Sequence, residues 1–212
     1  MDEEKARAAA RSFASSATDA DRLEQYVALL IEENSRQNLI SAASVDTVWN
    51  RHILDSAQLL RFVDHAGPLT WLDIGTGPGL PGMVVAALRP SWTMLLVEPR
   101  KQRCDFLRRC VESLHLENVQ IIQQRIELVS VGPVDLVSAR ALSNIEAIVA
   151  HAAPFATADT YWLLHRGKSV ARELQELPRQ LADMFHVEQS LTSEESKVLI
   201  GRGRPSQRTH RG

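Results

Sequence analysis

Apolar residues recur at helical spacing near the start of the chain and predict an amphipathic helix there. The residues that follow the i, i+3, i+4, i+7, i+8 pattern are Leu23, Tyr26, Val27, Leu30 and Ile31. Asp21 and Glu24 form a capping box, so we expect this helix to begin at Asp21. The Ala- and Ser-rich residues 1–20 predict a frayed or loose helix, and Ser44 is expected to open a second helix.

Beyond Gly67-Pro68, short apolar runs alternate with helical patterns. Strands are expected at 69–74, 92–97, 118–124, 134–139 and 160–165. Helices are expected at 80–89, 100–116, 142–153 and 168–182. This alternation predicts a doubly wound, mostly parallel α/β sheet. Two last runs, Phe185 to Leu191 and Lys197 to Ile200, predict an antiparallel hairpin and a sheet of seven strands. That layout is typical of the class I, Rossmann-like methyltransferase fold.

The same patterns divide the chain into an N-terminal helical extension (1–66), a methyltransferase domain (67–200) and a flexible basic tail (201–212). The tail contains four arginines, among them Arg202 and Arg204, and no acidic residue. Such a segment has no core to bury and suits RNA phosphates. An inert solubility tail is the alternative.

Composition narrows the class of protein. The chain has 212 residues and a formal net charge of −2, which predicts no overall attraction to polyanions. No apolar run approaches the roughly 18 residues of a membrane helix, and the acidic start is unlike a signal peptide. The two cysteines, Cys104 and Cys110, and the scattered histidines match no metal spacing. We therefore expect a cytoplasmic protein with reduced thiols, no metal and no membrane partner, and we expect a monomer.

The segment Asp73-Ile74-Gly75-Thr76-Gly77-Pro78-Gly79-Leu80-Pro81-Gly82 carries the clearest chemical signal. A strand that ends in a glycine-rich turn and continues as a helix is a cradle for a nucleotide cofactor. Glycine permits positive φ and lets a ligand approach the bare backbone. The helix start adds free N–H groups and a positive dipole end.

Two carboxylates help to choose the nucleotide. Asp73, directly before the turn, suits the ammonium group of S-adenosylmethionine and would repel a pyrophosphate. Glu98 ends the next strand and suits the ribose hydroxyls of either S-adenosylmethionine or NAD. A short-chain NAD oxidoreductase needs Tyr-x-x-x-Lys, which neither Tyr26 nor Tyr161 begins. The plainer alternatives are a turn acid for Asp73 and a solvated acid for Glu98.

The glycine segment occurs together with Asn38-Leu39-Ile40, His52-Ile53-Leu54-Asp55-Ser56 and Arg125-Ile126-Glu127. With these motifs, residues 21–200 resemble the ribosomal RNA small subunit methyltransferase G family (glucose-inhibited division protein B). The resemblance implies that Gly75 and Leu80 contact S-adenosylmethionine, together with Gly77 and Gly79 of the same loop. It also implies that Ile126 and Glu127 lie beside the adenine.

Arg140 matches the family's arginine after the fourth strand. The family usually reads Ser-Arg-Ala at this place, whereas this chain reads Ser138-Ala139-Arg140-Ala141. The resemblance further implies methylation of guanine N7 in the 530 loop of 16S rRNA, either in free rRNA or in a small ribosomal subunit precursor.

Guanine N7 carries a lone pair and no proton, so its methylation is an in-line displacement that needs no general base. Catalysis should come from alignment and electrostatics. The catalytic candidates are Arg140, which suits the O6 and N7 edge of guanine, and Asn38. Candidates for RNA binding are Arg166, Lys168, His52, Arg202 and Arg204. Each has a structural alternative: a salt bridge for Arg140, a turn for Asn38, packing with Asp55 for His52, and a solvated basic turn for Arg166 and Lys168.

Two other functions fit the same motifs. A small-molecule methyltransferase would use the helical extension as a lid over its pocket. A nucleotide-binding regulatory module would bind the cofactor without turnover.

Overall fold

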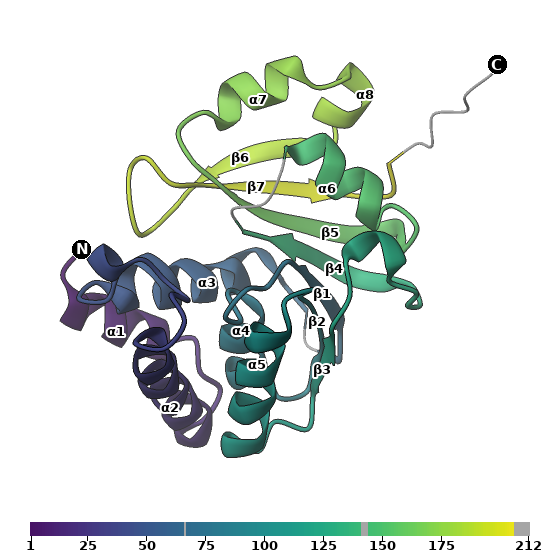
Figure 1. The fold of residues 1–212 in the computed structure, drawn as a ribbon. Coiled ribbons are helices and arrows are strands. Elements are labelled where there is room, and N and C mark those ends of the chain that lie inside the picture. The colour runs from purple at the N-terminus through teal and green to yellow at the C-terminus, as the bar shows by residue number, and fades with distance from the viewer. Residues whose placement is uncertain (66, 141–143, 206–212) are drawn as a thin grey trace.

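The computed structural model describes residues 1–65, 67–140 and 144–205. Its centre is a seven-stranded sheet with the order β3-β2-β1-β4-β5-β7-β6 (Figure 1). The strands are β1 Thr70–Ile74, β2 Thr93–Val97, β3 Val119–Ile122, β4 Val134–Ala139, β5 Ala156–Arg166, β6 Phe185–Gln189 and β7 Lys197–Arg202. Strands β1 to β5 are parallel, and β7 runs antiparallel to both β5 and β6. The expected fold class is confirmed.

Helices cover both faces of the sheet. They are α4 Gly82–Leu88, α5 Lys101–Ser113, the 3-10 turn η4 Ile126–Leu128, α6 Ile145–Ala152, α7 Val170–Glu176 and α8 Arg179–Ala182. Alternate residues of β1 serve the two faces, since Trp71 packs with α4 and α5 while Leu72 packs with α6. The single helix expected at 168–182 is wrong. Pro178 divides it into α7 and α8, because proline has no N–H to continue the helix.

The N-terminal region is more ordered than its composition indicates. Its elements are α1 Glu3–Arg11, α2 Ala17–Asn34, η1 Ala42–Ser44, η2 Trp49–Leu54, α3 Asp55–Ala57 and η3 Gln58–Phe62. The expectation that 1–20 are frayed is wrong, because Ala6 and Ala10 of α1 are fully buried. The start at Asp21 is also wrong. Ser16 caps α2 by accepting the Asp19 N–H at 3.2 Å, which allows the helix to begin one turn earlier.

The second helix does not begin at Ser44. A 3-10 turn ends there, and the next helical segment, η2, has π-helical hydrogen bonding. Glu3 of α1 holds the start of η2, since its carboxylate accepts the N–H groups of Trp49 and Asn50, both at 2.9 Å. This segment carries His52 and leads directly into Asp55.

The N-terminal extension has no core of its own. Tyr26 and Leu30 of α2 are completely buried in one cluster with Met83 and Val84 of α4 and with Trp71 of β1. Figure 1 shows the purple helices α1 and α2 beside α4 and α5. The extension is therefore an added layer on one face of the sheet.

Strand β7 continues to Arg202, and the Gly203 N–H then donates to the Thr160 carbonyl at 2.8 Å. A flexible tail that begins at residue 201 is therefore wrong, because strand pairing with β5 extends past Ile200. The expectation for 206–212 lies outside the described residues. In the described part of the chain, no helix has both the length and the apolarity that crossing a bilayer requires.

Candidate active site

The glycine-rich turn follows β1 at the carboxyl edge of the sheet, where β1 has β2 on one side and β4 on the other. Gly75, Gly77 and Gly79 have φ of +65°, +60° and +108°, which side chains other than glycine rarely adopt. A Cβ atom on Gly79 would lie 2.3 Å from Met83 Cγ. The Tyr26 hydroxyl of α2 supports the turn by donating to the Pro78 carbonyl at 3.0 Å. The turn is thus rigid and open only on its outer side.

Asp73 is completely buried, and both of its carboxylate oxygens accept hydrogen bonds from the protein. Oδ2 accepts the Gly82 N–H at 2.9 Å, and Oδ1 accepts the Ser138 hydroxyl of β4 at 2.7 Å. Burial raises the pKa of Asp73, and these hydrogen bonds act in the opposite direction. The observed bonds are those of a turn acid that ties the loop to β4, and contact with a methionine ammonium stays a prediction.

Glu98 is only 3% exposed, so the alternative of a solvated acid is wrong. Its Oε2 accepts the Gly77 N–H at 3.1 Å, and its Oε1 accepts the Arg100 N–H at 2.9 Å. Arg103 Nη1 lies 3.5 Å from Oε2. Glu98 therefore stands against the glycine turn, where we predicted a ribose-binding acid, and the ribose contact itself stays a prediction.

A cavity of about 420 Å³ opens over the turn, and we call it the loop cavity. Its lining residues are Leu39, Ile40, His52, Gly75, Thr76, Gly77, Pro78, Leu80, Arg100, Arg103 and Arg140. The volume is within the range of small-molecule sites. Three predicted cofactor residues, Gly75, Gly77 and Leu80, line it. Gly79 supports it from behind.

Arg140 and His52 meet at the inner end of the loop cavity. Arg140 Nη2 donates to His52 Nδ1 at 2.7 Å and to the Arg51 carbonyl at 3.0 Å. Because arginine can only donate, His52 Nδ1 is the acceptor, and Nε2–H donates to the Ser44 hydroxyl at 2.8 Å. Burial and the Arg140 charge lower the pKa of His52 to about 4, so the ring is neutral near pH 7.

Arg140 is largely buried beside Asp55, with Arg140 Nε 3.9 Å from Asp55 Oδ2. Burial lowers the pKa of Arg140 and Asp55 raises it; arginine nevertheless stays protonated. Arg140 Nη1 has no hydrogen-bond partner in the described part of the protein. The structural alternative of a simple salt bridge therefore leaves one buried donor of Arg140 unexplained.

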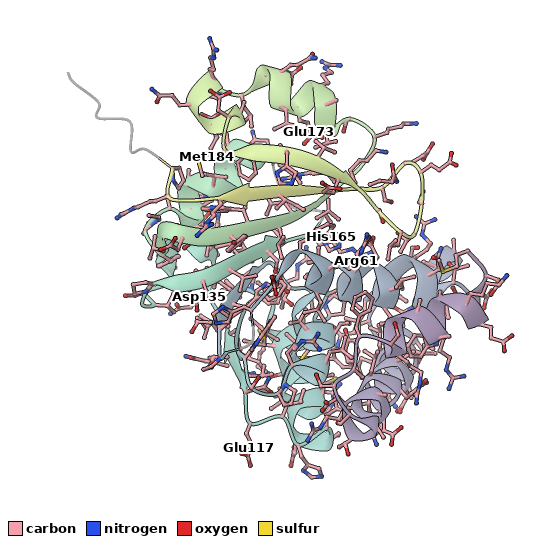
Figure 2. All side chains as sticks on the ribbon, turned by 180° about the vertical axis from the view of Figure 1, so that it is seen from behind. Arg61, Glu117, Asp135, His165, Glu173 and Met184 are labelled. Atoms are coloured by element: carbon pink, nitrogen blue, oxygen red, sulfur yellow. The ribbon has the colours of Figure 1, made fainter. Side chains whose placement is uncertain are left out.

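A second cavity of about 700 Å³, the hairpin cavity, lies on the other side of this pair. It is enclosed by residues 41–55, by the end of β5 and by the loop between β6 and β7. His52 and Arg140 line both cavities. Asp55 joins the walls, since its Oδ1 accepts the Thr192 hydroxyl at 3.0 Å and its carbonyl lies 2.7 Å from His165 Nε2. Figure 2 shows His165 where the sheet meets this helical segment.

The other predicted residues are placed less uniformly. Arg166 lines the hairpin cavity, but its side chain is only 9% exposed and lies 3.8 Å from Glu173 of α7. Lys168 is 79% exposed and 3.7 Å from Glu195. Asn38 is exposed and lines neither cavity, although Leu39 and Ile40 beside it do. A catalytic role for Asn38 therefore has no geometric support.

Ile126 and Glu127 lie on η4 after β3, outside the residues that line the loop cavity. Glu127 pairs there with Arg125 at 3.4 Å and with His151 at 3.7 Å. They stand beyond the same carboxyl edge of the sheet as the glycine turn. Their adenine contact stays a prediction.

Arg202 lies at the opposite edge of the sheet from the glycine turn, and the expectation that it belongs with the site is wrong. Because β7 is antiparallel to β5, its first residue Lys197 pairs with Arg166 at the site, and its last residue Arg202 pairs with Tyr161. Arg202 binds Asp159 at 2.9 Å and lies over the Tyr161 ring. Arg204 follows at that far edge and is exposed.

The sequence patterns did not single out Tyr26, Arg100 or Arg103 as parts of the site. Tyr26 carries only the signal of a core helix position, because its hydroxyl contact depends on the packing of α2 on the loop. Arg100 and Arg103 follow the strand that ends at Glu98, which is a position where ligands bind in this fold. Cys104 and Cys110 are buried free thiols, and burial raises the pKa of Cys110 to about 12. No group of three or more His, Cys, Asp and Glu among the described residues is arranged to hold a metal.

Comparison with known proteins decides the family. The model of the family "rRNA small subunit methyltransferase G" matches residues 19–200. The chain belongs to the rRNA small subunit methyltransferase G family. The family member from Erythrobacter litoralis is 46% identical over 92% of this chain and 95% of its own length. The member from Sphingopyxis alaskensis is 45% identical over 92% of this chain and 83% of its own.

Solved structures support the fold. An S-adenosylmethionine-dependent methyltransferase from Aquifex aeolicus gives a TM-score of 0.55 at 14% identity, covering 73% of this chain and 92% of its own. MtNAS in complex with S-adenosylmethionine gives 0.55 at 15% identity, covering 85% and 76%. Family and fold together make this chain an S-adenosylmethionine-dependent methyltransferase.

The loop cavity fits that cofactor. Gly75 and Gly77 provide bare backbone, Glu98 provides a carboxylate at the turn, and Leu80 provides an apolar wall. These are the residues that would hold S-adenosylmethionine. When bound, it supplies a methyl group on a positively charged sulfur.

Proposed function

We propose that this methyltransferase methylates N7 of a guanine in the 530 loop of 16S rRNA, by direct in-line transfer without a general base. The observation that supports this reaction most is the pair Arg140–His52, which stands where the loop cavity meets the hairpin cavity. The nucleophile has to approach at this junction, because the cofactor lies on one side of it. The family name supports rRNA as the substrate class.

The protonation states at the junction suit an acceptor that has no proton to lose. His52 uses Nδ1 to accept from Arg140 and Nε2 to donate to Ser44, so neither nitrogen is free to take a proton. The Asp55 carboxylate is buried and accepts from Thr192 and from Gln58. An unprotonated ring nitrogen such as guanine N7 needs no base, whereas an amine or hydroxyl acceptor would need one.

In this mechanism the chain contributes alignment and charge. The glycine turn and Glu98 fix one reactant, and the hairpin cavity fixes the other. Their relative position reduces the entropy that the reaction would otherwise lose. Arg140 offers a fixed donor to the base edge that becomes more acidic as N7 is alkylated. Preorganised donors of this type are worth about 3–4 kcal/mol in mutational studies.

The test is nucleoside mass spectrometry of 16S rRNA from cells with and without this protein. We expect 7-methylguanosine in the 530 loop to disappear without the gene and to return with the wild-type gene. Return with Arg140→Ala should fail even though that variant is folded. Unchanged 7-methylguanosine in both strains would exclude the proposed target. Loss of a different modified nucleoside would identify another acceptor.

A further inference from the structure

The hairpin cavity contains polar atoms that the protein itself does not use. Four such atoms belong to residues that line it and have no hydrogen-bond partner among the described residues: Thr47 Oγ1, Asn50 Oδ1, Arg140 Nη1 and His165 Nδ1. Buried polar atoms nearly always have a partner, so a concentration of four beside one cavity points to a ligand. His165 is only 8% exposed, and its other nitrogen already binds the Asp55 carbonyl.

The donors and acceptors in this set are not random. Because His165 Nε2 faces a carbonyl, it carries the proton, and Nδ1 of the neutral ring is an acceptor. Asn50 Nδ2 donates to the Thr192 carbonyl, which leaves Asn50 Oδ1 as a second acceptor. Arg140 Nη1 is a donor, and Thr47 Oγ1 is able to donate or accept.

We propose that the hairpin cavity receives one unpaired guanine nucleotide of the RNA, turned out of its base stack. Guanine presents two neighbouring donors, N1–H and N2–H, beside the acceptor O6. The acceptors Asn50 Oδ1 and His165 Nδ1 match the donors, and Arg140 Nη1 matches O6. Adenine has an amino group where guanine has O6, so it would place a donor against Arg140. This proposal rests on the proposed function and names the substrate-binding part of the same site.

The shape and charge of the cavity support a single nucleotide. Its volume of about 700 Å³ exceeds that of the loop cavity but cannot take a duplex. Sequence-specific proteins commonly bind unstacked bases of single-stranded RNA. The side chain of Arg51 is exposed in the lining and forms no ion pair within the described part of the chain, so it is available to the nucleotide's phosphate.

Thr47→Val is the sharpest variant, because it removes an unpartnered hydroxyl and keeps the shape of the side chain. Full-length wild type and variant are assayed on small ribosomal subunits from cells that lack this methyltransferase. We expect kcat/KM for the subunit to fall about tenfold, the equivalent of one lost hydrogen bond. The Kd for S-adenosylmethionine and the thermal stability should not fall, since no protein group loses a partner. Thr93→Val, exposed on β2 at the other edge of the sheet, is the matched control.

Binding of mononucleotides tests the site without relying on RNA methylation. Guanosine 5′-monophosphate and adenosine 5′-monophosphate are titrated into the wild-type protein with S-adenosylhomocysteine, and backbone amides are followed by NMR. We expect the guanine nucleotide alone to shift amides in 41–52 and 192–197. Shifts confined to other segments, equal shifts with both nucleotides, or full activity of Thr47→Val on subunits would overturn the proposal.

The two hypotheses fail differently. If wild-type protein methylates subunits but the guanine nucleotide binds elsewhere, the assigned pocket is wrong and the proposed function stands. If the nucleotide binds in this pocket but subunits are never methylated at guanine N7, the proposed function is wrong and the guanine site stands.

Discussion

Arg140 donates a 2.7 Å hydrogen bond to His52 Nδ1, and this contact joins the end of β4 to the N-terminal helical extension. Both side chains line the loop cavity and the hairpin cavity. The contact places a fixed positive charge between the two cavities and keeps the imidazole neutral. Cofactor and acceptor would meet at this point, so variants of these two residues are informative.

Arg140→Ala should retain the fold and lose turnover. Removing a preorganised donor costs about 10²–10³-fold in kcat in comparable sites, and we expect a loss of that order on small ribosomal subunits. Single-turnover methyl transfer measures the effect, with circular dichroism as the check of folding. Arg179→Ala is the control, since Arg179 is 95% exposed on α8. A normal transfer rate with a lowered melting temperature would show that Arg140 is only structural.

The His52 ring should make stability depend on pH. Its pKa falls from 6.5 to about 4 in the folded protein, so between these values the unfolded chain binds a proton that the folded chain does not. The free energy of unfolding is therefore unaffected by His52 above pH 6.5 and decreases as the pH falls toward 4. Because the ring is partly exposed, we expect a decrease of about 2 kcal/mol.

Urea unfolding of wild type and His52→Gln at pH values from 7.5 to 4.5 measures this effect. Glutamine does not titrate, so the difference in unfolding free energy between the two proteins should shift in favour of the variant as the pH falls. Parallel curves would show that His52 accepts a proton as readily in the folded state as in the unfolded chain.

Gly79→Ala should destabilise the protein and abolish cofactor binding. The new Cβ would lie 2.3 Å from Met83 Cγ at a residue with φ of +108°, so the turn has to move. Strained backbone positions of this type cost about 1–3 kcal/mol. Gly132→Ala is the matched control, because nothing lies within 4 Å of its Cβ position. Calorimetry with S-adenosylmethionine and thermal melting should separate the two variants, and equal behaviour would contradict the rigid turn.

Glu98→Ala should weaken S-adenosylmethionine binding by about 1–3 kcal/mol, because the turn loses the acceptor of the Gly77 N–H and the ribose loses a carboxylate. Glu112→Ala, exposed on the same helix that follows Glu98, should bind normally. Isothermal calorimetry gives both affinities. Unchanged affinity would exclude the ribose role, and binding of NADH without S-adenosylmethionine would contradict the cofactor assignment.

Arg51 and Arg202 should differ in RNA binding although both are exposed arginines. Each phosphate neutralised on single-stranded RNA adds about 0.7 to the slope of log affinity against log salt. Arg51→Ala should lower that slope by about this amount, because Arg51 lies in the lining of the hairpin cavity. Arg202→Ala should leave it unchanged, because Arg202 binds Asp159 at the far edge of the sheet. Filter binding at several salt concentrations tests both, and the reverse result would move the RNA surface to that edge.

Much of the fold follows from local patterns in the sequence. Alternating apolar runs and helical periods determine β1 to β5 and their parallel order, because each element buries one stripe or face. Glycines at 75, 77 and 79 determine the turn, since their positive φ is closed to other residues. Glu98 is likewise found from its place at the end of the strand after the loop.

Only the tertiary structure decides the two cavities. Arg140 and His52 are 88 residues apart, and Asp55 and Thr192 are 137 apart, so no local pattern pairs them. The antiparallel direction of β7 carries Arg202 away from the site and brings the hairpin loop toward it, a consequence of sheet topology. Figure 1 shows that loop near the N-terminal helices and the end of β7 on the opposite side. Sequence thus determined which residues can do chemistry, and packing over long separations decided which of them meet.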